Sequence, residues 1–94
     1  MLLGRVVGHV VATRKDEKLT GLKLLVVRGI DPAGEESASY HVAADTVDAG
    51  LGDRVLCVIG SSARMAAGME GRPVDAAIVG VVDAVEVEPR GRRT

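Results

Sequence analysis

The segment 54–67 reads RVLCVIGSSARMAA, and its character changes at Gly60. Residues 54–59 form a short apolar run with several β-branched side chains, which predicts a buried strand. Serine is a preferred N-cap, and Ser61 and Ser62 precede residues of good helix propensity. We therefore expect a strand over 54–59, followed by one short helix that ends near Gly68 or Gly71.

Four other short strands are expected around this unit. They are separated by glycine, proline and charged residues, and they fall at about 2–13, 22–28, 39–44 and 76–87. The charged segment 14–18 mixes signs and predicts a solvated loop. Residues 31–34, Asp-Pro-Ala-Gly, have the chemistry of a type I turn within a hairpin. Five short strands with a single helix after the fourth predict a mainly β fold, an antiparallel barrel that resembles the OB class.

The size and composition indicate one small domain with a thin core. The chain has 94 residues, and we expect a single domain over 1–88 and a flexible basic tail over 89–94. Hydrophobic residues are 47% of the chain, but Phe and Trp are absent and Tyr40 is the only aromatic residue. Cys57 is the only cysteine, so no internal disulfide compensates. Oligomerisation is therefore the expected way to bury more surface.

The charge balance and hydropathy exclude several classes of partner. Twelve Lys and Arg stand against 13 Asp and Glu, which gives a net charge of −1. Nucleic-acid binders carry a basic excess and often aromatic platforms, so we expect no nucleic-acid partner. The apolar runs are far shorter than the roughly 20 residues that span a bilayer, so we expect no membrane partner. The first residues do not resemble a signal peptide, which predicts a reducing cytosol.

Candidate catalytic and metal-ligating residues are few. Cys57 lies inside an apolar run, where a free cysteine usually behaves as a small buried hydrophobe. His9 and His41 have no spacing that resembles a zinc site, and we expect them at exposed strand or interface positions. No nucleophile has a nearby candidate base. The sequence therefore predicts no enzymatic activity, no metal and no cofactor.

The pentapeptide Gly60-Ser61-Ser62-Ala63-Arg64 has two interpretations. Backbone N–H groups before a helix, together with two hydroxyls and a guanidinium, are suited to hold a small anion. The same residues also fit an ordinary helix cap with a salt-bridging arginine. Both interpretations stay open at this point.

Three aspartates, Asp45, Asp48 and Asp53, surround the two glycines of the preceding loop. Their arrangement is not that of a calcium-binding loop. Aspartate tolerates a left-handed backbone and accepts hydrogen bonds from its own chain. These residues therefore predict turns.

Several segments in order carry a family resemblance. They are GRVVG at 4–8 with VVATRK at 10–15, LTGLKLLVV at 19–27, ADTVDAGLGDRVL at 44–56, GSSAR at 60–64 and PVDAAIVGVVD at 73–83. The last two are the most specific. Together the segments resemble the pentameric vertex proteins of bacterial microcompartment shells, of the ethanolamine-utilisation N and carboxysome L type, over about residues 1–85.

This resemblance implies a structural, non-catalytic subunit with an OB-like barrel that forms a homopentamer at the corner of a polyhedral shell. It implies hexameric and trimeric shell proteins of the same compartment as partners, and a location in the shell within the bacterial cytoplasm. By analogy, Gly60, Ser61, Ser62, Ala63 and Arg64 border a narrow central pore on the ring axis. Where the family often has glycine this chain has Asp48, which is expected in a left-handed turn at some steric cost.

A second hypothesis comes from the barrel class rather than from the motifs. Small OB barrels also serve as binding modules, here for an oligonucleotide or a small anion. Because the chain lacks a basic excess and aromatic platforms, we expect a labelled single strand not to bind.

Overall fold

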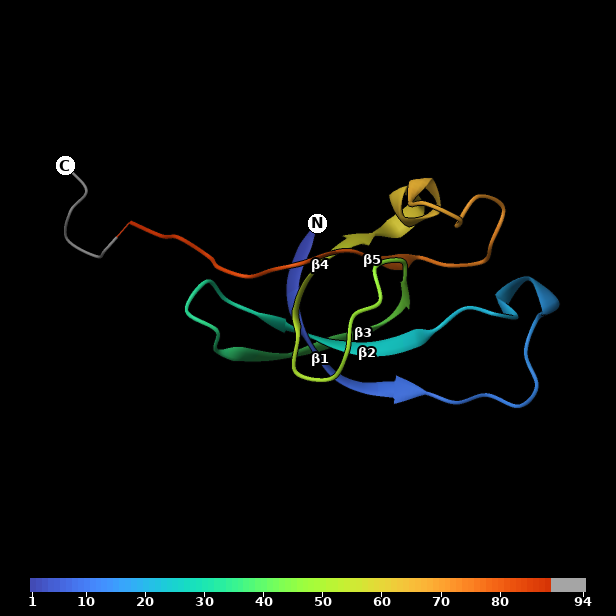
Figure 1. The fold of residues 1–94 in the computed structure, drawn as a ribbon, viewed down its shortest axis with the longest axis horizontal. Helices are drawn as coiled ribbons and strands as arrows, with labels where there is room; N and C mark the ends of the chain where they lie inside the picture. Colours follow the sequence, from blue (N-terminus) through green and yellow to red (C-terminus); the bar gives the residue numbers. More distant parts are fainter. Residues whose placement is uncertain (89–94) are drawn as a thin grey trace.

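Five strands and two short 3-10 helices form the regular structure of residues 1–88, the part of the chain that the computed structural model describes. In chain order they are β1 (Leu2–Val10), η1 (Glu17–Leu19), β2 (Leu24–Ile30), β3 (Glu36–Asp45), β4 (Arg54–Ile59), η2 (Gly60–Met65) and β5 (Ala76–Val81). The strands close into a barrel in the order β1-β2-β3-β5-β4, drawn in Figure 1. The predicted mainly β, OB-like barrel is confirmed. The predicted tail at 89–94 lies outside the described residues.

Strand pairing differs from the prediction in one place. The contacts β1–β2, β1–β4, β2–β3 and β4–β5 are antiparallel, as expected. However, β3 and β5 run parallel, with Ala44 opposite Ala77 and Asp45 opposite Ile78. Parallel neighbours need a long crossover connection, which the chain makes through β4 and η2. The barrel is therefore mixed rather than purely antiparallel.

The predicted strand bounds hold for β4 but are too long for β1 and β5. β1 ends at Val10 rather than Thr13, and β5 ends at Val81 rather than Val87. Val82 still donates its backbone N–H to Arg54 O at 2.8 Å. Beyond it, residues 83–88 leave the barrel as an extended C-terminal arm, orange to red in Figure 1. Alternating side chains predict a strand, but a strand forms only where a neighbouring strand supplies hydrogen bonds.

The turn between β2 and β3 has the chemistry that its sequence predicts. Gly34 has a φ of +91°, a conformation that glycine adopts without steric cost, and donates its N–H to Asp31 O at 2.9 Å. Asp31 Oδ1 accepts two further backbone N–H groups of the turn at 2.9 and 3.0 Å. The hairpin is confirmed, although β2 and β3 extend closer to the turn than predicted, to Ile30 and from Glu36.

Small aliphatic side chains fill the interior of the barrel. Along β2 burial alternates, and Leu25 and Val27 point inward. We call the buried set the inner core; its members are Val6, Leu25, Val27, Ala43, Ala49, Val55, Cys57, Ala76 and Ile78. The inner core contains no charged residue, and its only heteroatom side chain is the thiol of Cys57. Hydrophobic burial and close packing therefore stabilise the interior, at about 25 cal/mol per Å² of apolar surface.

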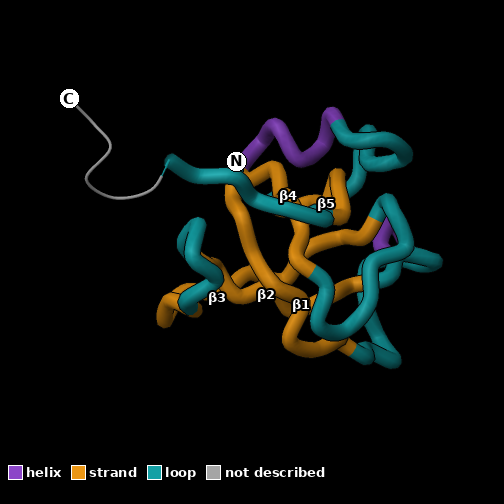
Figure 2. The backbone as a smooth tube through the Cα atoms, turned by 60° about the vertical axis from the view of Figure 1, so that its left-hand side comes forward, coloured by secondary structure: helices purple, strands orange, loops and turns teal. Residues whose placement is uncertain are grey.

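A second, smaller hydrophobic cluster lies outside the barrel. This outer cluster has the buried members Ala44, Ala63, Met69, Val74 and Ala77. Figure 2 shows η2, in purple beside β4, outside the ring of strands. The end of the segment 14–18, predicted as a solvated loop, overlaps η1. Asp16 caps η1 by accepting the Lys18 N–H at 2.8 Å, and Leu19 packs at the edge of the outer cluster. The outer cluster thus anchors the segments that cover one side of the barrel.

Candidate functional site

Residues 60–64 directly follow β4 and turn the chain out of the barrel. Gly60 makes this turn with a φ of +77°, a left-handed conformation that glycine adopts without steric cost. Its N–H donates to Asp75 O at 2.7 Å, which ties the start of η2 to the residue before β5. The ends of β4 and β5 therefore position the whole pentapeptide.

The helix after β4 is a 3-10 helix, and the predicted serine N-cap is wrong. The helix already begins at Gly60, so the cap position falls on Ile59, which has no capping side chain. Ser61 and Ser62 lie inside the helix and are exposed. Within residues 1–88 neither hydroxyl has a hydrogen-bond partner. Both hydroxyls are therefore open to solvent or to another molecule.

The other two side chains of the segment face opposite environments. Ala63 is fully buried in the outer cluster and anchors η2 to the barrel. Arg64 is exposed, and its Nη1 donates to Val74 O at 3.5 Å, at the long limit of a hydrogen bond. In the described part of the chain Arg64 makes no ion pair, so the salt-bridging arginine of the helix-cap interpretation is not found there. The segment combines an apolar anchor with an exposed polar surface.

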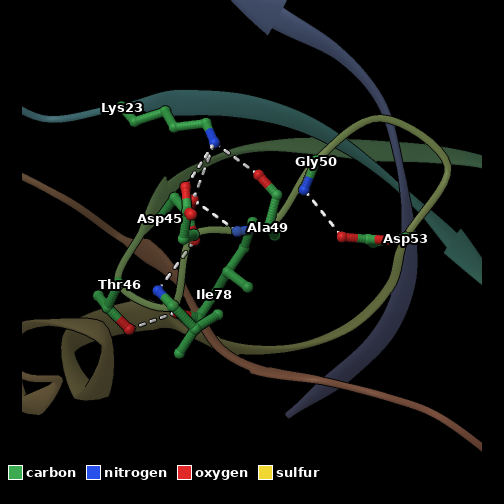
Figure 3. A network of polar contacts seen from close by, with 9 residues as sticks. Lys23, Asp45, Thr46, Ala49, Gly50, Asp53 and Ile78 are labelled. Atoms are coloured by element: carbon green, nitrogen blue, oxygen red, sulfur yellow. Dashed lines mark hydrogen bonds and ion pairs between the residues drawn. The ribbon is translucent and has the colours of Figure 1, made fainter.

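The loop 46–53, which leads into β4, is held by aspartate side chains (Figure 3). The two carboxylate oxygens of Asp45 accept backbone N–H groups of the loop at 3.0 and 2.9 Å. Asp53 Oδ2 accepts the Gly50 N–H at 2.9 Å. The turn role predicted for Asp45 and Asp53 is confirmed.

Lys23 joins this loop to the start of β2. Its Nζ donates to Ala49 O at 2.6 Å and lies 3.5 Å from Asp45 Oδ2 and 3.4 Å from Asp48 Oδ1. The Asp45 side chain is 2% exposed and the Asp48 side chain 98%, so the Asp45 pair carries most of the interaction. The role of Lys23 was not predicted from the sequence, because its partners are more than 20 residues away along the chain.

Two further residues, Asp48 and Thr46, determine the backbone conformation of the loop and its attachment to β5. Asp48 has a φ of +59°, the only positive φ of a non-glycine residue in the described chain. The left-handed conformation expected for Asp48 is confirmed. Thr46 Oγ1 donates to Ile78 O at 2.6 Å, which fixes the loop to β5. Ala49 then enters the inner core and helps to close the end of the barrel.

The remaining candidate residues have little reactivity in this environment. Cys57 is fully buried, and burial raises its pKa from 9.0 to about 11, so the thiol stays protonated at neutral pH. The prediction of a buried cysteine is confirmed. His9 is exposed as expected, whereas His41 is half-buried and its Nδ1 has no hydrogen-bond partner.

The described residues contain neither a metal-binding cluster nor a membrane-spanning helix. No group of three or more His, Cys, Asp and Glu residues there is arranged to hold a metal ion. No helix in the same part of the chain is long and apolar enough to cross a membrane. The apolar barrel, the anchored loop and the exposed segment 60–64 define a small structural β-barrel module.

Comparison with known proteins identifies the family. The family model described as ethanolamine utilisation protein EutN/carboxysome matches residues 1–83. The carboxysome shell vertex protein CcmL of Gloeobacter violaceus is 48% identical, over 96% of this chain and 90% of CcmL. The microcompartment shell vertex protein EutN of Escherichia coli (strain K12) is 45% identical, over 90% of each chain. The structure of GrpN, a pentameric microcompartment shell protein from Rhodospirillum rubrum, is 45% identical with a TM-score of 0.86, covering 94% of this chain and 100% of that chain.

The chain therefore belongs to the EutN/carboxysome family of bacterial microcompartment shell vertex proteins. It is a structural component of a shell, and the family is not enzymatic. The resemblance drawn from the sequence motifs is confirmed. The match to the family model ends at Asp83, where the C-terminal arm begins.

Proposed function

We propose that this chain forms a homopentamer that closes a corner of a microcompartment shell in the bacterial cytoplasm. Hexameric and trimeric shell proteins of the same compartment are its partners in this proposal. The observation that carries it is the likeness to GrpN over nearly the whole chain, since GrpN is described as pentameric. A flat layer of hexagonal tiles cannot enclose a volume, and fivefold units at the corners supply the closure.

Exposed apolar side chains support assembly into a ring. Val10 and Val42 are 37% and 45% exposed, on β1 and β3, and Val11 is exposed just beyond β1. Leu51, in the loop before β4, is 65% exposed. A cyclic ring joins two different patches of each subunit head to tail, so separate apolar patches suit such a contact.

We place residues 60–64 around a narrow pore on the axis of this ring. Gly60 and Ala63 are small, and the free hydroxyls of Ser61 and Ser62 suit a hydrated opening. Arg64 is loosely held and lines an open surface depression of about 500 Å³ together with residues 65–68 and Glu70. These features support an exposed, polar rim around the pore.

Native mass spectrometry tests the assembly. Five copies of the 9.7 kDa chain give a complex of about 49 kDa at micromolar concentration. A stable monomer or dimer under the same conditions contradicts the pentamer.

Cross-linking tests the position of residues 60–64. In the variant Ser62→Cys, equivalent thiols lie close together around a narrow axis, so a short bis-maleimide links neighbouring subunits. Glu35→Cys is the matched control, because Glu35 is exposed near the turn between β2 and β3, remote in the sequence from the segment. An intact pentamer in which Ser62→Cys cross-links no better than Glu35→Cys contradicts the pore position.

A further inference from the structure

Three arginines form a row across the outside of the barrel. Arg5 on β1 lies directly opposite Arg28 on β2, and it also lies directly opposite Arg54 on β4. Tyr40 on β3 lies opposite Arg28. Residues paired in this way project from the same face, about 5 Å apart. We call Arg28, Arg5 and Arg54 the arginine row, with Tyr40 at its end.

The row faces outward because its neighbours along the strands face inward. Val6, Val27 and Val55 follow or precede the arginines in sequence and are all fully buried in the inner core. Successive residues of a strand point to opposite faces. The three arginines are separated by more than 20 residues along the chain, so only the strand register brings them together.

The row is short of counter-charge. Arg28 Nε lies 3.8 Å from Glu36 Oε1. Arg54 Nη2 donates to the backbone oxygen of Asp83 at 2.8 Å, which neutralises no charge. Arg5 has no ion pair within residues 1–88, and its Nε is buried without a hydrogen-bond partner. Like charges opposite each other destabilise a sheet, so an acidic group from outside the subunit suits this face.

The C-terminal arm has the complementary chemistry. Residues 83–88 read DAVEVE and carry acidic and valine side chains in an extended segment. The arm leaves its own barrel beside Arg54 and runs away from it (Figure 1). The six residues of the arm, fully extended, reach about 20 Å, and the two shorter extents of the molecule are 23 and 21 Å. The arm is therefore long enough to reach across much of an adjacent copy.

We propose that the arm of one copy lies across the arginine row of its neighbour in the ring, with Glu86 paired to Arg5. This inference rests on the proposed pentamer. Each copy offers one arm and one row, which is what a head-to-tail ring requires. A guanidinium binds a carboxylate through two parallel hydrogen bonds, and this pairing supplies the counter-charge that Arg5 lacks within residues 1–88. None of the three arginines lines the depressions beside the β2–β3 turn, beside Val74 or beside Arg64, so the row suits an extended segment better than an enclosed small ligand.

A charge-swap cycle on the full chain tests the contact. Arg5→Glu brings two carboxylates together and raises the apparent dissociation constant of the ring contact about tenfold or more, and Glu86→Arg does the same. The double variant restores the contact to within about threefold of wild type. Arg14→Glu is the matched control, because it makes the same charge change at an exposed position between β1 and η1 and leaves the ring intact. Sedimentation velocity and native mass spectrometry measure the pentamer, and circular dichroism checks that each variant folds.

Salt provides a second readout that does not depend on reversing a charge. The wild-type ring weakens between about 0.05 and 0.5 M salt because the ion pair is screened. Arg5→Gln removes the charge and reduces this salt dependence. An equal salt dependence of wild type and Arg5→Gln contradicts the pairing.

The outcomes separate this inference from the proposed function. A wild-type monomer at micromolar concentration overturns the pentamer and with it the docked arm. If the wild type is a pentamer and both Arg5→Glu and Glu86→Arg assemble as it does, the docked arm alone is overturned. The docked arm is also overturned if both single variants lose the pentamer and the double variant does not recover it. If the wild type binds a labelled single-stranded oligonucleotide and Arg5→Glu abolishes this binding, the arginine row has another partner. This outcome also overturns the docked arm.

Discussion

The inner core and the outer cluster consist of similar small apolar side chains, yet they are enclosed differently. Hydrogen-bonded strands surround the inner core on all sides, and Val27, Val55 and Ile78 are fully buried. The outer cluster has strands on one side and the 60–75 segment on the other, and Met69 and Val74 are 3% and 7% exposed. We infer that burial in the inner core provides most of the stability of the barrel, whereas fewer packing contacts hold the segment that carries residues 60–64.

The largest effect is expected inside the barrel, from Ile78→Ala. Ile78 is the largest fully buried side chain, and its removal leaves a cavity that closed strands cannot fill. We expect the free energy of unfolding to fall by about 3–4 kcal/mol, measured by chemical denaturation at a fixed protein concentration. A loss below about 1 kcal/mol contradicts the view that the inner core carries the stability.

The pH dependence of stability tests the closure of the inner core at Cys57. Burial raises the pKa of the folded thiol from 9.0 to about 11, so the unfolded chain ionises first as pH rises. The contribution of the protonated thiol to the free energy of unfolding is therefore fully present below about pH 9. It decreases between about pH 9 and 11, by up to roughly 2–3 kcal/mol. The variant Cys57→Ala has no thiol to ionise. The difference in unfolding free energy between wild type and Cys57→Ala therefore changes between about pH 9 and 11. Parallel pH profiles of the two proteins contradict it.

In the outer cluster, Met69→Ala is expected to cost less than Ile78→Ala. The surrounding loop can move into the space, so we expect a loss of about 2 kcal/mol, at the low end for this substitution. Met65→Ala is the control, because Met65 is 87% exposed and its loss changes stability by less than about 0.5 kcal/mol. If Met69→Ala destabilises the chain as much as Ile78→Ala, the two regions do not differ as we infer.

A smaller effect is expected where the loop 46–53 is attached to β5. Thr46→Val keeps the shape of the side chain but removes its hydrogen bond to Ile78 O, while the backbone N–H of residue 46 still donates to that oxygen at 3.3 Å. We expect a loss of about 1 kcal/mol and faster amide exchange at Ala49, which the loop holds in the inner core. Unchanged exchange at Ala49 contradicts a role of Thr46 in holding the loop.

The smallest effect is a gain. Asp48→Gly relieves the left-handed conformation of Asp48 and loses only an exposed ion pair to Lys23. We expect stability to rise by about 0.5 kcal/mol, seen as an increase in melting temperature. A fall in melting temperature indicates that the Lys23 pair outweighs the backbone strain.

Features set by neighbouring residues were predictable from the sequence. The bounds of β4, the turn at 31–34 and the turns at Asp45 and Asp53 follow from apolar runs and turn chemistry. The serine cap failed because the helix begins at Gly60, so the cap position falls on Ile59 and both serines lie inside the helix. The end of β5 failed because alternation of side chains does not reveal whether a partner strand is present. The contacts of Lys23 had no local signal at all.

The sequence alone determined the class of the protein. Its apolar runs, its turn residues and the two specific motifs at 60–64 and 73–83 indicated a five-stranded barrel of the shell vertex type. Only the tertiary structure decided the parallel closure of β3 on β5, the burial of Ala63 beneath exposed serines and the alignment of Arg5 with Arg28 and Arg54. The physical reason is that side-chain patterns along a strand define its faces, whereas register and neighbours depend on how the whole barrel closes.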